Sequence, residues 1–150
     1  MNHNEIMDGS VAVLPLIMRW LHIASVVTLI GGFIFARFAV APALAALPDA
    51  ERKTTESRVA AYFSPILYVA LGAVLVSGLY NYLSQTNLPP LYHMILGIKL
   101  LFVVHIVAVS ILYSLPSANP DKRRRWLTGM IVSGLIIIAL AGYLHFIPKS

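Results

Sequence analysis

Long apolar segments separated by short polar ones make up most of the chain. Charged residues are absent from four segments, at residues 20–36, 59–98, 100–120 and 126–148. A helix needs about 20 mainly apolar residues to cross the hydrocarbon core of a bilayer. The pattern therefore predicts one domain over residues 1–150, an all-α integral membrane protein with an up-down-up-down bundle of four transmembrane helices. We expect the spans at about residues 11–40, 59–83, 91–115 and 126–147.

Proline and polar residues predict where these helices end. Pro42 and Pro48 follow the first span, and the polar sequence DAERKTTESR at residues 49–58 is expected to form the first loop, either irregular or with a helical turn of its own. The uncharged sequence SQTNLPP at residues 84–90 predicts a second turn, and the prolines at 116 and 120 predict a third.

The composition supports a membrane location and narrows the chemistry. Hydrophobic residues make up 59% of the chain and charged residues 11%, far below the quarter that is usual in soluble domains. The chain has no cysteine, which excludes disulfides, iron–sulfur clusters, thiolate zinc sites and thiol catalysis. Histidine, with methionine as a softer alternative, is then the remaining ligand for a transition metal or haem iron.

Basic residues gather beside two of the three predicted loops. Eight of the eleven belong to the first or third loop or to the adjoining helix ends: Arg37, Arg52, Lys53, Arg58, Lys122, Arg123, Arg124 and Arg125. The positive-inside rule places these loops in the cytoplasm and both termini outside, as expected for a multi-pass protein of a bacterial inner membrane. The net charge of +5 is then explained by topology and contact with membrane lipid, and no nucleic-acid partner is expected.

Two charged residues lie inside the predicted spans. Arg19 and Lys99 are costly at such depth and usually face the bundle interior, a cavity or a partner. The alternative for both is snorkelling, with the aliphatic stem in lipid and the charged group at the membrane surface. Lys99 lies ~12 Å past Leu91 at 1.5 Å per residue, which is a long reach for a snorkelling side chain.

Four histidines lie within or beside the spans. His93 and His145 fall near the outer rim, where they could pair, whereas His22 and His105 lie deeper, ~12–18 Å and ~20 Å from the outside. A b-type haem could bridge these two deeper histidines. Arg19 lies one turn nearer the outside than His22, where it could hold the haem propionates. The alternative for each histidine is a structural ring that is hydrogen-bonded to a backbone carbonyl or another helix.

Two segments resemble a known family. RWLHIASVVTLIGGFIFARFAVAPAL at residues 19–44 resembles the first helix of the copper-resistance D type membrane domain and of the related HemJ-type protoporphyrinogen oxidases. YHMILGIKLLFVVH at residues 92–105 is similar to their third helix. In the HemJ-like branch the resemblance implies haem b and a functional histidine and lysine that match His22 and Lys99. In the copper-resistance branch it implies copper handling.

Three classes of function are therefore weighed. The first is a haem-b redox protein that exchanges electrons with quinone or oxidises a porphyrinogen, with His22 and His105 as ligands and Lys99 facing a carboxylate and acting in catalysis. The second binds or transports copper, for which the amino-terminal sequence Met1-Asn2-His3 offers nitrogen ligands at His3. The third is a non-catalytic membrane subunit, and a homo-oligomer is compatible with all three.

Overall fold

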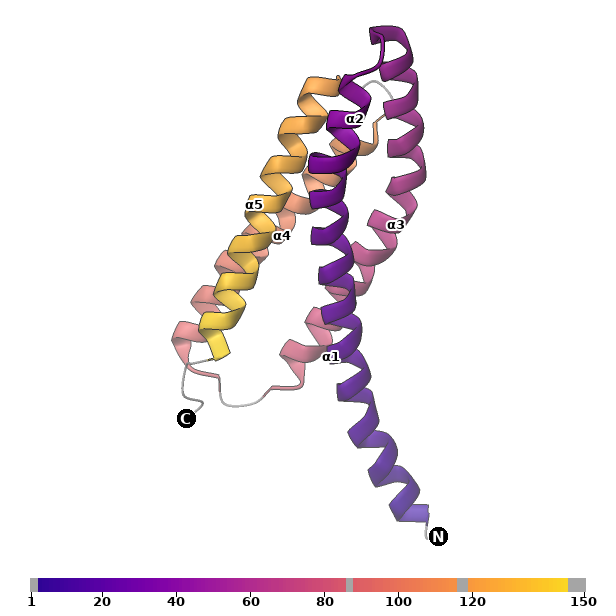
Figure 1. Ribbon diagram of the computed structural model, residues 1–150. Coiled ribbons are helices and arrows are strands. Elements are labelled where there is room, and N and C mark those ends of the chain that lie inside the picture. Colours follow the sequence, from indigo (N-terminus) through magenta and orange to yellow (C-terminus); the bar gives the residue numbers. More distant parts are fainter. Residues whose placement is uncertain (1–2, 86–87, 116–118, 146–150) are drawn as a thin grey trace.

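The computed structural model describes the backbone of residues 3–85, 88–115 and 119–145, and the side chains of residues 13–144 within those ranges except Pro120. Throughout these ranges the regular structure is helical (Figure 1). The elements in order are α1 (His3–Phe35), the π-helix η1 (Ala36–Val40), α2 (Ala41–Ala45), α3 (Asp49–Leu83), α4 (Pro90–Ser114) and α5 (Pro120–His145).

Four helical segments of the described chain are long and apolar enough to cross a membrane, at residues 13–45, 49–83, 90–114 and 121–144. They alternate in direction, so the predicted all-α four-helix membrane bundle is confirmed. In Figure 1 the start of α1, the end of α5 and the α3–α4 connection lie at one end of the bundle, here called the termini end. The α2–α3 and α4–α5 connections lie at the other, here called the basic end.

The helices pack as two pairs. α1 packs chiefly against α3 and α4 chiefly against α5, while α1 also contacts α5 and α3 contacts α4. Figure 1 shows the two pairs close together near the basic end and farther apart toward the termini end. Large apolar side chains cover the outside, with Val69 74% and Leu101 72% exposed. A surface of this kind suits lipid, because water would not favour so much exposed apolar area.

The polar segment at residues 49–58 is helical throughout, where the sequence predicts a loop with at most a helical turn of its own. It forms the first turns of α3, and only residues 46–48 connect it to α2. Asp49 and Glu51 lie in the first turn, where carboxylates interact favourably with the helix dipole. Asp49 also makes an ion pair with Arg52, with 3.4 Å between Oδ1 and Nη2. The run Arg123–Arg125 is likewise helical, as part of α5.

The first span also continues past its predicted end. Pro42 has no N–H to donate, so a regular α-helix would leave the Phe38 carbonyl without its usual partner. Residues Ala36–Val40 form a wider π-helical turn, in which the Ala41 N–H donates to the Ala36 carbonyl, and α2 follows in the same direction. Arg37 on this turn donates from Nε to Thr128 Oγ1 of α5 at 3.0 Å.

The tightly packed core lies in the basic half of the bundle. Phe33 of α1, Phe63 of α3 and Tyr113 of α4 form a chain of edge-to-face aromatic contacts, with ring centroids 6.4 and 6.3 Å apart. Leu67 and Met130 are fully buried beside them. Gly32 allows α1 to approach α3, because a Cβ atom there would lie 2.8 Å from Phe63 Cζ.

Hydroxyl groups also join helices within this core. Ser64 Oγ of α3 lies 2.8 Å from Ser114 Oγ of α4, and Ser110 Oγ lies 3.5 Å from Met130 Sδ of α5. The hydroxyls of Ser64, Ser110 and Ser114 also lie within hydrogen-bond distance of the carbonyl four residues earlier, and each can donate its one hydrogen to either partner. Such bonds satisfy polar groups in a region without water and contribute to helix association in membranes.

Arg123 secures the end of α4. Its side chain is only 2% exposed, and it donates from Nε to the Tyr113 carbonyl at 3.2 Å and from Nη2 to the Leu115 carbonyl at 2.7 Å. Its guanidinium carbon also lies 5.8 Å from the centre of the Tyr113 ring. Half-buried Glu56 of α3 is near enough to interact with this charge. The last carbonyls of a helix lack N–H partners within the helix. Here Arg123 of the next helix donates the missing hydrogen bonds.

Candidate functional site: a histidine–serine pair near the termini end

His22 of α1 is held against α3 by a hydrogen bond. Its Nδ1 lies 3.0 Å from Ser77 Oγ, and Ser77 is completely buried. The ring also lies beside Gly78, where a Cβ atom would be 3.2 Å from His22 Cε1. His22 is nine residues past Val13, ~14 Å along the helix, and Ser77 is six residues before the end of α3. The pair therefore lies in the termini half of the bundle.

The hydroxyl of Ser77 bears on the tautomer of His22. A serine hydroxyl has one hydrogen to donate, and both the Ala73 carbonyl of its own helix and His22 Nδ1 lie within hydrogen-bond distance of Ser77 Oγ. When this hydrogen goes to Ala73, Ser77 Oγ accepts from His22 Nδ1–H and the ring lone pair is on Nε2. A neutral imidazole oriented in this way can bind a metal or accept a proton through Nε2.

Two cationic side chains accompany this pair. Lys99 of α4 is half-buried and close enough to act electrostatically on His22, and Arg19 lies one turn of α1 nearer the termini end, where it is exposed. The sequence has no Asp or Glu between Asp8 and Asp49, or between Glu56 and Asp121. The apolar parts of the spans therefore supply no carboxylate to balance Lys99 and Arg19. The region around His22 is electropositive and suited to a group that carries negative charge.

His105 lies in a different place. It is exposed on α4, and its Nε2 would be 3.5 Å from a Cβ atom at Gly129 of α5. It is nine residues from the end of α4, ~14 Å from the basic end. The structure thus places His22 in the α1–α3 pair and His105 in the α4–α5 pair. A shared haem between these two histidines remains a prediction, and no contact in the structure supports it.

The outer histidines are only partly described. His93 is exposed near the start of α4, and its Nδ1 lies 3.2 Å from Tyr82 Oη of α3. The two rings meet edge to face with centroids 6.1 Å apart. The side chains of His145 and His3 lie outside the described residues, so the predicted pairing of His93 with His145 and copper binding at His3 remain predictions. Among the side chains that are described, no group of three or more His, Asp or Glu residues could hold a metal ion.

Sequence reasoning did not identify Ser77 as a partner of His22. A serine inside an apolar span was the available signal, because a hydroxyl in such a place needs a hydrogen-bond partner. The partner could not be chosen without the pairing of α1 with α3. Tyr82 as the partner of His93 was missed for the same reason.

The fold and site together define a four-helix integral membrane protein with a half-buried histidine oriented by a serine in an electropositive region. Comparison of the chain with known protein families, with curated proteins and with solved structures finds no match. The resemblance to the copper-resistance D type and HemJ-type proteins therefore remains an expectation from two segments of sequence.

Proposed function

We propose that the protein is a haem-b-binding redox protein of a bacterial inner membrane, in which His22 would hold the haem iron in the outer half of the bundle. The observation that carries this proposal is the bond from His22 Nδ1 to Ser77 Oγ. Histidines that bind metals usually donate their other ring nitrogen to a partner that fixes the ring and its tautomer. The bond leaves Nε2 of His22 available for iron, and Ser77 keeps the ring oriented.

The charges around His22 favour haem over a copper ion. Haem b carries two propionates, which can balance Lys99 and Arg19, whereas a bare metal cation would be repelled by them. Burying a cation in a membrane protein without an anionic partner is costly, so Lys99 is more favourable with a carboxylate beside it. The same argument suits a porphyrin substrate, since it also carries carboxylates.

The residues would act in separate roles. His22 would bind iron through Nε2, Ser77 would hold the ring, and Lys99 with Arg19 would hold carboxylates of haem or of a porphyrin. A bound haem b would supply one-electron chemistry, for which quinone or a porphyrinogen is the proposed reaction partner. The bundle would keep water from the ligand, and its two basic connections would face the cytoplasm.

The absorption spectrum of the purified protein in detergent, followed by a metal assay, tests this proposal. We expect a Soret band in the spectrum and iron in the metal assay. Copper without a Soret band would support the copper alternative, and a colourless protein without metal, after expression with added haem precursor, would support a non-catalytic subunit. Either result would refute the proposal.

A further inference from the structure

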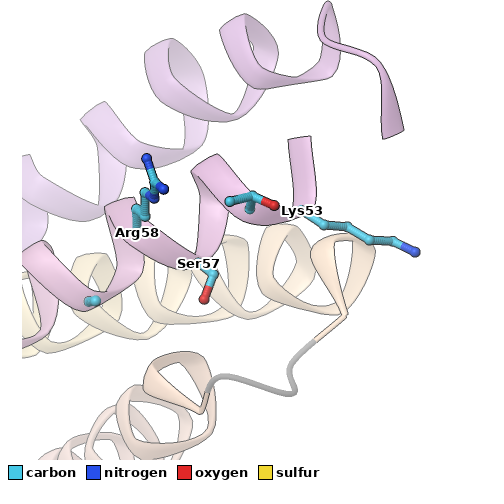
Figure 2. A pocket seen from close by; sticks show the side chains of 5 residues that line it. Lys53, Ser57 and Arg58 are labelled. Atoms are coloured by element: carbon cyan, nitrogen blue, oxygen red, sulfur yellow. The ribbon is translucent and has the colours of Figure 1, made fainter. Parts of the chain in front are cut away.

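A shallow groove lies on the outside of α3 near the basic end (Figure 2). Its lining consists of Lys53, Thr54, Ser57, Arg58 and Ala61. These positions share one face of the helix, because residues three or four positions apart lie next to each other on a helix surface. The groove has a volume of about 460 Å³ and is open along the surface of the helix. It lies where the polar start of α3 meets the apolar segment that begins at Val59.

The groove is positively charged. Figure 2 shows Lys53 and Arg58 extending to different sides of α3, with the Ser57 hydroxyl directed away from both. Both basic side chains are exposed, and no ion pair holds either of them within the described part of the chain. Neighbouring Arg52 differs, since it is half-buried and paired with Asp49. Lys53 and Arg58 are therefore available for an anion from outside the protein.

The same face of α3 continues into the membrane as an apolar surface. Below Ala61, positions on this face are exposed and uncharged: Pro65, Tyr68, Val69, Gly72 and Val76. A ligand that filled the groove and followed this surface would need an anionic group at one end and hydrocarbon at the other. A phospholipid of the cytoplasmic leaflet has this construction, and its headgroup would lie at the depth of the groove.

We propose that the groove binds the phosphate of an anionic phospholipid, with Lys53 and Arg58 as its cationic contacts and Thr54 and Ser57 as hydroxyl contacts. The acyl chains lie along the exposed face of α3 below Ala61. This site is separate from His22, which lies in the termini half, and it does not depend on the proposed haem chemistry. Long, flexible Lys and Arg side chains at exposed positions can turn toward the phosphate from both sides of the groove.

Spin-labelled phosphatidylglycerol in phosphatidylcholine vesicles tests the site with the full-length protein. The double variant Lys53→Gln/Arg58→Gln is compared with Arg124→Gln/Arg125→Gln, which removes two exposed charges from the same end of the bundle. Each basic contact is expected to strengthen association of the labelled lipid about five-fold. We expect the first variant to lose this preference and the second to retain most of it. The single variants Lys53→Gln and Arg58→Gln should each lose part.

Three results would overturn the proposal. Equal losses in the two double variants would indicate a diffuse attraction of lipid to the basic end. Unchanged association in Lys53→Gln/Arg58→Gln would show that the groove does not bind the headgroup. Displacement of the labelled lipid by soluble glycerol phosphate at the same concentration would show that the groove binds free phosphate esters and that the apolar face contributes nothing.

Discussion

At the scale of single residues, His22 differs from His93 and His105, the other histidines whose side chains the structure describes, because its hydrogen-bond partner is completely buried. Sequence reasoning could single out His22, because an imidazole within an apolar span and three residues from an arginine suggests a ligand for a metal or cofactor. It could not supply Ser77, because that contact joins residues 55 positions apart and depends on how α1 packs on α3. His105, equally prominent in the sequence, lies exposed beside Gly129.

Replacing Ser77 with alanine should weaken haem binding without removing it. The variant loses the acceptor that orients His22, and loss of such a partner commonly costs about 10–100-fold in affinity for the bound metal group. Haem titration of the apoprotein, followed by the Soret band, measures the change. Ser84→Ala is the control, because Ser84 is an exposed serine near the end of the same helix. Equal affinities in the two variants would remove Ser77 from the site.

The adjacent glycines Gly31 and Gly32 of the first span have different surroundings. A Cβ atom at Gly32 would lie 2.8 and 2.9 Å from the Phe63 ring, whereas at Gly31 it would have no neighbour within 4 Å. We expect Gly32→Ala to reduce the free energy of unfolding by about 1–3 kcal/mol through overpacking. Gly31→Ala should be neutral or stabilising, because alanine favours a helix by up to about 1 kcal/mol over glycine. Thermal unfolding in detergent compares the two, and equal effects would contradict the packing of α1 on α3.

At the scale of helices, the four spans were predictable, but their ends were less so. Charged residues at 49–58 and 121–125 mark the membrane boundary, yet they also form good helices, so α3 and α5 begin before their apolar segments. Hydropathy indicates where an apolar segment begins, but it does not indicate where the helix begins. Pro42 similarly does not end the first span, because the π-helical turn at residues 36–40 accommodates its missing N–H.

Arg123 is expected to stabilise the α4–α5 connection as well as to orient the protein. Removing it leaves the Tyr113 and Leu115 carbonyls without their charged donor, and hydrogen bonds to charged groups are worth about 1.5–3 kcal/mol each. Arg123→Gln should therefore lower the unfolding temperature in detergent clearly more than Arg124→Gln, since Arg124 is exposed. Both variants lose one positive charge, so any effect of this charge on membrane topology is the same in both and does not alter the comparison. Equal unfolding temperatures would contradict the structural role of Arg123.

At the scale of the whole molecule, composition was sufficient to predict a membrane bundle, but not the pairing of its helices. A span that is apolar on all sides carries little information about which face meets a neighbour. The expectation that His22 and His105 share a cofactor stays a prediction, and the pairing of α1 with α3 and of α4 with α5 could not be derived from hydropathy. Small contacts such as Gly32 with Phe63 determine these pairs, and hydropathy alone does not reveal them.

The orientation of the bundle can be tested directly because the natural chain has no cysteine. Ser84→Cys lies at the termini end and Asn119→Cys at the basic end, and both positions are exposed. In intact spheroplasts, an impermeant thiol reagent should label Ser84→Cys and spare Asn119→Cys until the membrane is permeabilised. The reverse labelling pattern would place His22 in the cytoplasmic half and the lipid groove in the outer leaflet.

The central claim is that His22 ligates haem through Nε2, and rescue by free imidazole tests it most directly. His22→Ala, expressed in membranes and purified beside the natural protein and His105→Ala, should lose the Soret band or shift it strongly. Added imidazole should restore the band, because it can occupy the space of the missing ring and supply the same nitrogen ligand. A Soret band in His22→Ala that is unchanged from the natural protein, with or without imidazole, would contradict the account.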